Sequence, residues 1–314
     1  MSYEEFLEKI REDIQRYLPV EYASNEAQIV KRMINNGAFY YGLSVRRQGS
    51  NVAPLLNLKS YYEDYMRGHT LVDTLRDIAA TYYHLDIRTP ALSVEDFLYE
   101  NIKDKIFVAI CNADLNREEL ANAPHELKED LALRYYIRYE CSDNEVGTIR
   151  IRNEHLKLWN ISPEELKKQA WKNMKCVLKP TLQTLKQIAM GSLRIPNEDM
   201  RSYADEVYVL TSEKQTCGAA YLFDDFVMRS IATILDDDLL ILPSSVDEVL
   251  LVRRNSDEGG ISVSHLKEIV EEVNRSCVEP EEFLSDEVYL YEKGTHQLSI
   301  ANDGEQQMDM SMNM

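Results

Sequence analysis

Short β-rich runs and amphipathic helical segments alternate along this chain, and this order constrains its fold most strongly. Val207 to Leu210 and Val249 to Val252 have the composition of strands. Residues 226–235 and 264–274 repeat apolar side chains at the spacing of a helix with one buried face. The pattern predicts an α+β fold with mixed antiparallel sheets and packed helices.

Three local signals fix where elements begin or turn. Ser2 and Glu5 can form a capping box at the start of a helix that Pro19 ends. Asn35-Asn36-Gly37 separates two strand-like runs, which predicts a hairpin. Ser162 before Pro163 predicts another helix start. The remaining expected strands are 106–110, 131–139, 148–151, 219–222, 239–242 and 288–290, and the remaining expected helices are 70–84 and 181–190.

A chain of 314 residues is long enough for two or three modules. Arg88-Thr89-Pro90 interrupts the preceding helical pattern and marks the first expected boundary. Residues 191–203 contain Pro, Asn and Ser with little periodicity, so they are the best linker candidate. The expected division is an N-terminal α+β module over 1–90, a middle α+β module over 91–190, a C-terminal α+β module over 205–293 and a disordered tail over 301–314.

The charge of the chain is negative and uneven. The formal net charge is -19, and residues 224–314 hold 21 acidic and 6 basic residues, a net of -15. Such a charge repels phosphate backbones, so nucleic-acid binding is disfavoured. A protein partner stays open, and the sequence does not identify it. A nucleic-acid accessory role would need a local basic patch in the first two thirds, for which the candidates are Lys31, Arg32, Arg46 and Arg47.

Cysteine usage and apolar run length indicate a cytoplasmic protein. The five cysteines are far apart and form no Cys-x-x-Cys pair, which favours free thiols and gives no support for a zinc site. The N-terminus begins Ser2-Tyr3-Glu4-Glu5, which does not match the pattern of a secretory signal. The longest apolar run, Ile106 to Cys111, is far shorter than the roughly 20 residues that a membrane-spanning helix needs. We therefore expect no membrane association, no metal and no cofactor.

Several stretches of the chain, taken in order, carry a resemblance to a known family. They are Asn57–Tyr65 (NLKSYYEDY), Pro124–Tyr136 (PHELKEDLALRYY), Ile151–Glu165 (IRNEHLKLWNISPEE) and Leu239–Leu251 (LLILPSSVDEVLL), extended by Val207–Leu210 (VYVL) and Leu284–Tyr291 (LSDEVYLY). They resemble an uncharacterised bacterial family, the domain of unknown function numbered fifty-six eighty-eight. The resemblance covers nearly the whole chain except the tail. It implies a source among anaerobic gut bacteria and an association with mobile-element cargo, and it implies no activity, cofactor or catalytic residue.

The segment from His125 to Asp130 is the nearest approach to a metal motif. A zinc peptidase helix has two histidines four residues apart and a glutamate that acts as base. Here Glu129 stands where the second histidine would be, and Asp130 follows it. The more common explanation of such a partial match is a loop that leads into a helix, with Pro124 setting the backbone and acidic residues favouring the helix N-terminus.

Two further positions have residues that could do chemistry. His155 could act as an acid or base, although a helix start with Asn153 as the N-cap explains the same residues. Cys217 could be a nucleophile with His265 as its base, although a small buried cysteine at the start of a strand is more common. Asp236-Asp237-Asp238 could bind a divalent cation, although a solvated acidic turn is the more common case.

No catalytic constellation emerges from these residues, and the chain has no glycine-rich phosphate loop. The leading hypothesis is therefore a non-catalytic interaction or accessory protein of the bacterial cytoplasm. The first alternative is a hydrolase that uses the region of His125, Glu129 and Asp130, or the region of His155. Convergence of these side chains in one pocket would favour the enzyme, and separate structural roles would favour the interaction protein.

Overall fold

The computed structural model describes residues 1–88, 95–140, 146–191, 207–255 and 262–302. Most of the expected linker over residues 191–203 and the expected tail beyond residue 302 lie outside the described residues. The contacts group the chain into two compact units, each described separately below. Unit 1 contains Met1–Ile102 with Arg138–Ile149, and unit 2 contains Lys103–Ile137 with Arg150–Met314.

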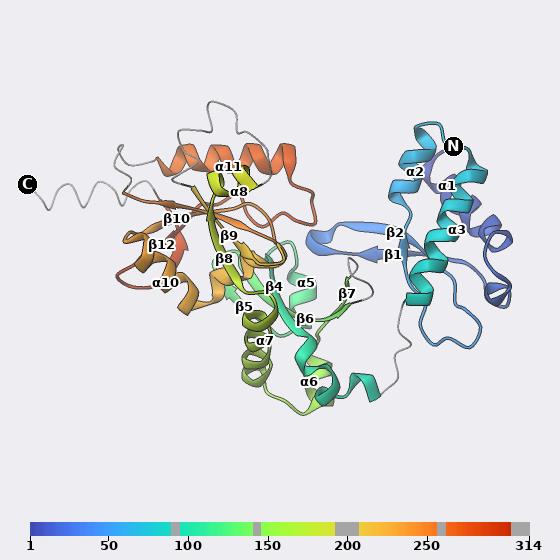
Figure 1. The fold of residues 1–314 in the computed structure, drawn as a ribbon, viewed down its shortest axis with the longest axis horizontal. Helices are drawn as coiled ribbons and strands as arrows, with labels where there is room; N and C mark the ends of the chain where they lie inside the picture. Colours follow the sequence, from blue (N-terminus) through green and yellow to red (C-terminus); the bar gives the residue numbers. More distant parts are fainter. Residues whose placement is uncertain (89–94, 141–145, 192–206, 256–261, 303–314) are drawn as a thin grey trace, which may run out of the picture. The chain divides into compact units, whose positions relative to one another are not determined.

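The elements follow one another in the order that Figure 1 colours from blue to red. Unit 1 contains α1 (Tyr3–Asp13), η1 (Ile14–Arg16), η2 (Val20–Tyr22), β1 (Gln28–Met33), η3 (Asn35–Gly37), β2 (Phe39–Ser44), β3 (Leu56–Asn57), α2 (Lys59–Met66), α3 (Leu71–Arg88), η4 (Glu95–Phe97) and α4 (Tyr99–Ile102). Two strands have residues in both units, β6 (Leu131–Glu140) and β7 (Val146–Arg150).

The other elements belong to unit 2. They are η5 (Lys103–Lys105), β4 (Ile106–Asn112), α5 (Arg117–Leu120), β5 (His125–Lys128), α6 (Asn153–Trp159), α7 (Pro163–Val177), β8 (Pro180–Thr184), α8 (Leu185–Gly191), β9 (Val207–Ser212), η6 (Gly218–Phe223), α10 (Asp225–Leu235), β10 (Leu239–Pro243), β11 (Val249–Arg253), α11 (Val263–Cys277), β12 (Tyr289–Tyr291) and β13 (Leu298–Ile300). Every strand pair for which a register is given is antiparallel, which confirms the expected α+β class.

Unit 1 packs a cluster of aromatic side chains against a mainly aliphatic core. The expected capping box forms at Ser2 and Glu5 and starts α1, which buries Phe6. Tyr62 and Tyr65 of α2 place their rings 5.3 and 5.8 Å from that of Phe6. These tyrosines belong to the stretch NLKSYYEDY, so their position explains part of the family resemblance as core packing.

The expected hairpin at Asn35-Asn36-Gly37 is confirmed. β1 and β2 pair from Gln28 opposite Ser44 to Met33 opposite Phe39, and β3 extends the sheet by a short pairing with β2. In Figure 1 the hairpin extends away from the helices of unit 1.

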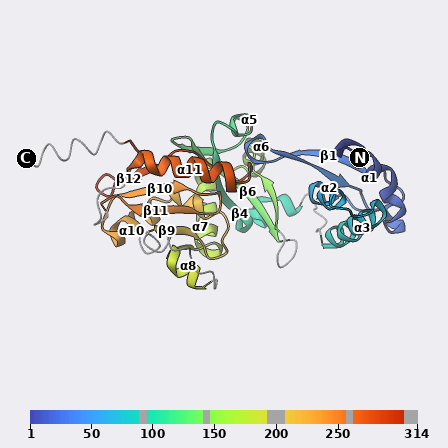
Figure 2. The same cartoon turned by 90° about the horizontal axis from the view of Figure 1, so that it is seen from above.

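Unit 2 contains two sheets. β4, β6 and β5 lie side by side in one of them, and β7 also pairs with β6. The other sheet has the order β13-β12-β10-β11-β9-β8. Side chains of β10 alternate between its faces, so Leu240 and Leu242 share a core with α11, which lies along one face of the sheet in Figure 2. α10 lies on the other side of this sheet in Figure 1.

Four sequence expectations are wrong in ways that affect the candidate sites. The helix expected to follow Pro180 begins only at Leu185, because Pro180–Thr184 pairs with β9 as an added edge strand. The strand expected at 219–222 is instead part of the buried 3-10 helix η6. His125–Lys128 forms a strand rather than a loop or a helix start. The apolar residues expected to form the buried face of the helix at 226–235 include Phe226 and Ile234, but these two are 72% and 74% exposed.

The division into three modules stays a prediction. The contacts place the expected middle and C-terminal modules mostly in one compact unit. The short strand β13 and Ala301, which is buried, extend that unit beyond the expected end at residue 293.

Candidate functional site

The residues of the partial metal motif lie on a β-hairpin in unit 2. His125 begins β5, where its Nδ1 lies 2.9 Å from the carbonyl oxygen of Ala123. Glu129 is exposed in the turn between β5 and β6 and has a left-handed backbone with φ 53°. A zinc peptidase helix holds both ligands on one helical face, whereas here His125 is at the start of a strand and Glu129 lies in the turn after that strand. The helical geometry of a zinc peptidase is therefore absent at these residues.

Asp130 occupies a polar joint between the two sheets of unit 2. Its carboxylate accepts hydrogen bonds from the Ser285 hydroxyl at 2.6 Å and from the Tyr289 hydroxyl at 2.5 Å. Both donors are at least 99% buried. Desolvation, followed by the hydrogen bond to Asp130, raises the pKa of Tyr289 far above its usual range. The phenol therefore stays protonated and acts as a fixed donor.

Backbone contacts strengthen the same joint. The amide nitrogen of Ala113 donates to the carbonyl oxygen of Asp130 at 2.8 Å, which continues the β4–β6 pairing and holds the backbone of Asp130 in place. The side chain of Asn112 donates to the carbonyl oxygen of Leu284 at 2.8 Å. The stretches PHELKEDLALRYY and LSDEVYLY thus meet here, and their polar residues join the sheets. Because the carboxylate is engaged by two buried hydroxyls, a structural role explains Asp130 fully.

His155 stabilises the start of α6. The amide nitrogen of Arg152 donates to its Nδ1 at 3.1 Å, and its ring stacks on Trp159 with centroids 5.4 Å apart. Desolvation and then the charge of Arg152 lower the pKa of His155. Arg152, rather than the expected Asn153, is the N-cap, and Leu156 and Trp159 are buried as expected. The histidine therefore acts as a neutral hydrogen-bond acceptor at this cap.

Two of the recognised stretches converge on Cys217, which the sequence did not show. Tyr136 of PHELKEDLALRYY places its hydroxyl 2.7 Å from the Cys217 sulfur, and the Thr216 hydroxyl lies 3.6 Å from the same atom. Asp247 of LLILPSSVDEVLL accepts the amide N–H of Cys217 at 2.7 Å. The cysteine is half-buried with φ 55°, so the expectation of a buried strand cysteine is wrong.

Gly218 follows the left-handed Cys217 at a point where the backbone is closely packed. A Cβ atom on Gly218 would lie 2.3 Å from Cα of Thr211 and 2.7 Å from the carbonyl oxygen of Asp247. That same oxygen accepts from the Gly218 amide at 3.0 Å and from the Thr211 hydroxyl at 2.8 Å. Glycine is therefore required here by a close approach of three backbone segments.

The contacts of Cys217 given above differ from those typical of a catalytic thiol. Reactive cysteines have cationic neighbours or a histidine base, whereas the contacts of Cys217 given above are two hydroxyls and a carboxylate. His265 is exposed on α11 and faces Glu268 of its own helix at 3.8 Å, so it is not the base. Desolvation and then the charge of Asp247 raise the pKa of Glu248 and of Glu282, which marks the region as acidic.

The three aspartates at 236–238 have structural partners. Asp236 pairs with Lys293 through a short ion pair, and Asp238 faces Arg254 at 3.7 Å. Asp237 accepts from the amide and the side chain of Asn255. Their carboxylates hold the connection between α10 and β10 in place. These contacts agree with an acidic turn rather than with a cation site. Within the described ranges, no group of His, Cys, Asp or Glu side chains is arranged to hold a metal ion.

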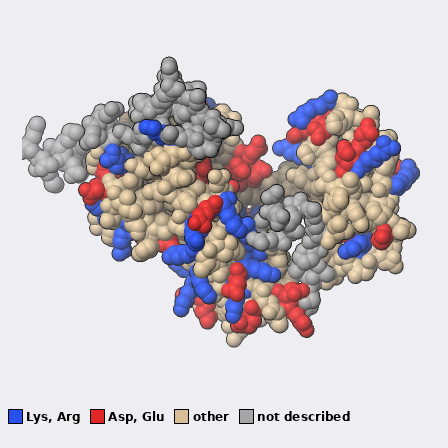
Figure 3. All heavy atoms as spheres, viewed as in Figure 1, with Lys and Arg blue, Asp and Glu red and all other residues tan. Residues whose placement is uncertain are grey.

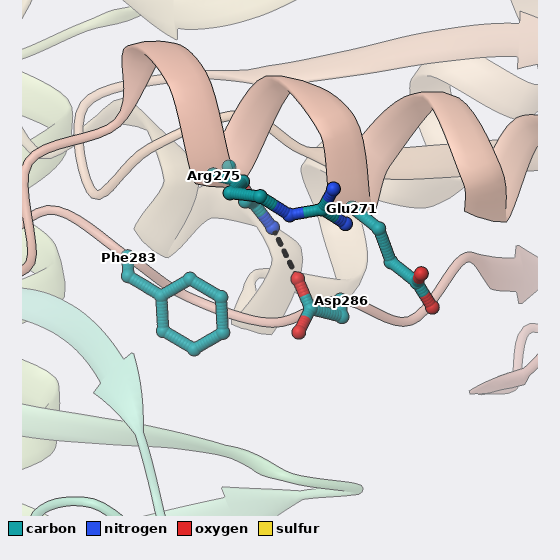
Figure 4. A pocket seen from close by; sticks show the side chains of 5 residues that line it. Glu271, Arg275, Phe283 and Asp286 are labelled. Carbon is teal, nitrogen blue, oxygen red and sulfur yellow. Dashed lines mark hydrogen bonds between the residues drawn. The ribbon is translucent and has the colours of Figure 1, made fainter.

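A shallow pocket of about 270 Å³ lies beside α11 in unit 2 (Figure 4). Its lining combines the cation of Arg275 with the carboxylates of Glu271 and Asp286, next to the ring of Phe283. The side chain of Asn274 donates to Asp286 at 2.8 Å. None of the predicted catalytic residues lines this pocket, so it does not gather them into a site.

The candidate basic residues of unit 1 do not form one patch. Lys31 lies opposite Tyr41 and Arg32 opposite Tyr40, and adjacent strand residues point to opposite faces. Arg47 pairs with the buried carboxylate of Asp86 at 3.0 Å. Lys31 and Arg32 therefore lie on different surfaces, and Arg47 is already bound to Asp86. A nucleic-acid accessory role would need these residues together in one patch.

Figure 3 shows a concentration of Lys and Arg side chains over the part of unit 2 that contains α7. Lys167 and Lys175 of this helix pair with Glu126 and Asp224. The sequence analysis did not single out these lysines, although their regular spacing in 163–177 is a visible signal.

Among the described helices, none combines the length and apolar character that crossing a bilayer requires. Cys111, Cys176, Cys217 and Cys277 are free thiols, and Cys141 lies outside the described residues.

Fold and site together define an α+β protein in which buried polar residues join the two sheets of unit 2. The profile of the Family of unknown function (DUF5688) matches residues 3–293, so the chain belongs to this family, which confirms the resemblance inferred from the sequence. Neither a curated protein nor a solved structure matches the chain.

Proposed function

We propose that this chain is a non-catalytic interaction protein, an accessory protein that binds a protein partner. The observation that supports this proposal is that the candidate acid–base groups hold the fold together at separate places. Asp130 joins two sheets through Ser285 and Tyr289, whereas His155 caps α6. A catalytic acid or base needs a free position within hydrogen-bond reach of a reacting group.

The proposed location is the bacterial cytoplasm. The four free thiols of the described chain are compatible with a reducing compartment. The proposed association with mobile elements follows from the family resemblance alone.

A direct test compares hydrolysis of p-nitrophenyl acetate, p-nitrophenyl phosphate and casein by the wild type with hydrolysis by His125→Ala and His155→Ala. We expect background rates for all three proteins. An activity of the wild type that disappears in either variant, while the melting temperature of that variant stays unchanged, would overturn the proposal and favour the hydrolase alternative.

A further inference from the structure

The β1–β2 hairpin is unusually exposed for a strand pair. Five of the six residues of β1 are exposed, whereas β4 in unit 2 has six buried residues of seven. Exposed apolar side chains extend along the hairpin, since Val30, Met33 and Phe39 are 38%, 47% and 48% exposed. Leu43 of β2 is buried and Ile29 and Tyr41 pack against the core of unit 1, whereas these three apolar side chains are exposed. Exposed apolar side chains gathered on one element are suited to a partner.

The charge of this region is opposite to that of the chain. Residues 27–62 contain no Asp or Glu, although the chain contains 54 acidic residues in 314. The same 36 residues contain five basic ones, Lys31, Arg32, Arg46, Arg47 and Lys59. Two of these, Lys31 and Arg32, lie on β1 itself, whereas Arg47 is engaged by Asp86. The hairpin therefore has two cations and no acidic residue, and an anionic segment would complement it.

The free edge of β1 is the place where a single ligand can contact both Lys31 and Arg32. In the described part of the chain, β1 pairs with β2 alone, so its other edge has unpaired backbone groups. Lys31 and Arg32 point to opposite faces of the hairpin, and a flat surface could therefore contact one of them only. An extended strand added along the edge would have side chains on both faces and could contact both.

Apolar and cationic contacts coincide on one face of the hairpin. The ammonium group of Lys31 lies 3.7 Å from the ring centroid of Phe39, which is paired with Met33 across the strands. A carboxylate beside an apolar side chain would match this arrangement. Two chains of this protein that paired through β1 would instead bring like charges together, which disfavours self-association through this edge.

We propose that the free edge of β1 binds an extended acidic segment of a partner protein as an additional strand, with adjacent carboxylates of that segment contacting Lys31 and Arg32. This inference rests on the proposed interaction function and names the chemistry of the partner. Backbone hydrogen bonds to the edge would supply affinity, and the carboxylates and flanking apolar side chains would supply specificity.

The test measures fluorescence anisotropy of labelled probes with the full-length protein. The acidic probe is the peptide Val-Thr-Val-Glu-Glu-Val-Thr-Val, whose two glutamates point to opposite faces of a strand. Comparison probes are the same peptide with lysines in place of the glutamates, the acidic peptide with N-methyl groups at alternate amides, and an oligothymidine strand. We expect binding of the unmethylated acidic peptide only, weakened when salt rises from about 50 to about 300 mM.

Variants separate the hairpin from general electrostatics. K31E/R32E should weaken the acidic peptide by at least about tenfold, because two attractive contacts become repulsive. The matched variant K168E/K172E makes the same charge change on exposed lysines of α7 and should leave binding unchanged. Equal loss in both variants, equal binding of the N-methylated peptide, absence of binding, or a preference for oligothymidine would each overturn the proposal. These results are independent of the hydrolysis assays, so each proposal can fail separately.

Discussion

The Tyr289 hydroxyl donates a hydrogen bond of 2.5 Å to the Asp130 carboxylate, although 159 residues separate the two in the sequence. The bond joins the turn before β6 to β12. Asp130, the acidic residue at the end of the partial metal motif, therefore has a structural partner in Tyr289. Its consequences for stability can be measured directly.

Replacement of Tyr289 by Phe removes this hydroxyl with little change of shape. We expect the free energy of unfolding to fall by about 1.5–3 kcal/mol, because a buried hydrogen bond to a charged group is lost. Asp130→Asn should lower it by a similar amount. Urea unfolding monitored by circular dichroism measures both.

The matched control for these variants is Glu129→Gln, at an exposed position next to Asp130. It should change the free energy of unfolding by no more than about 0.5 kcal/mol, as surface substitutions usually do. An unchanged urea midpoint in Tyr289→Phe would show that the hydroxyl is not a structural donor.

Gly218 provides a second stability test. In Gly218→Ala the new Cβ would lie 2.3 Å from Cα of Thr211, and a backbone atom cannot move aside cheaply. We expect destabilisation by at least about 1–3 kcal/mol. Gly294→Ala is the control, because a Cβ there meets nothing within 4 Å. Equal melting temperatures for the two variants would contradict the close packing at Gly218.

His155 should contribute to the pH dependence of stability. Its pKa is lowered in the folded protein from the ordinary value of 6.5, so the unfolded chain binds a proton first as pH falls. The stabilising effect is complete above the unfolded pKa and is lost as pH falls through the folded one. We expect His155→Gln to lose less stability than the wild type between pH ~7.5 and ~5. Parallel stability curves for the two proteins would refute this.

Residues 203–293 expressed alone should not give a cooperative melt. This fragment lacks β8 and β13, which are the two edge strands of its sheet. It also lacks Asp130 and Leu178, whose carbonyl oxygen accepts from the buried Tyr221 hydroxyl at 2.7 Å. Residues 103–302 are the comparison fragment and should unfold cooperatively in differential scanning calorimetry. A cooperative melt of the shorter fragment would establish an independent C-terminal module.

Local signals predicted many elements correctly because their causes lie within a few residues. Asn35-Asn36-Gly37 specifies the hairpin of β1 and β2, and Ser162 with Glu165 caps α7 as expected. The strand at His125–Lys128 was missed because only Leu127 is apolar there, and its pairing with β6 decides its conformation. Both faces of α10 carry apolar residues, so the sequence could not show that Phe226 faces solvent.

The candidate site was less predictable than the elements. The approach of Tyr136 to Cys217 joins positions 81 residues apart, and periodicity carries no information about such pairs. The same limit applied to Asp130. Its neighbours in the sequence suggested a metal motif, whereas its hydrogen-bond partners Ser285 and Tyr289 are more than 150 residues away in the sequence. By contrast, the absence of acidic residues over 27–62 was visible in the sequence and could have directed attention to the hairpin.

The chain enters unit 1, leaves it at residue 102 and returns for residues 138–149 before unit 2 resumes. A single cut at any peptide bond therefore cannot release either unit with all its residues. The same holds for the gene: one truncation, one duplication boundary or one simple fusion cannot pass on unit 1 complete without part of unit 2. A single recombination point within the chain would therefore divide unit 1 or carry part of unit 2 along with it.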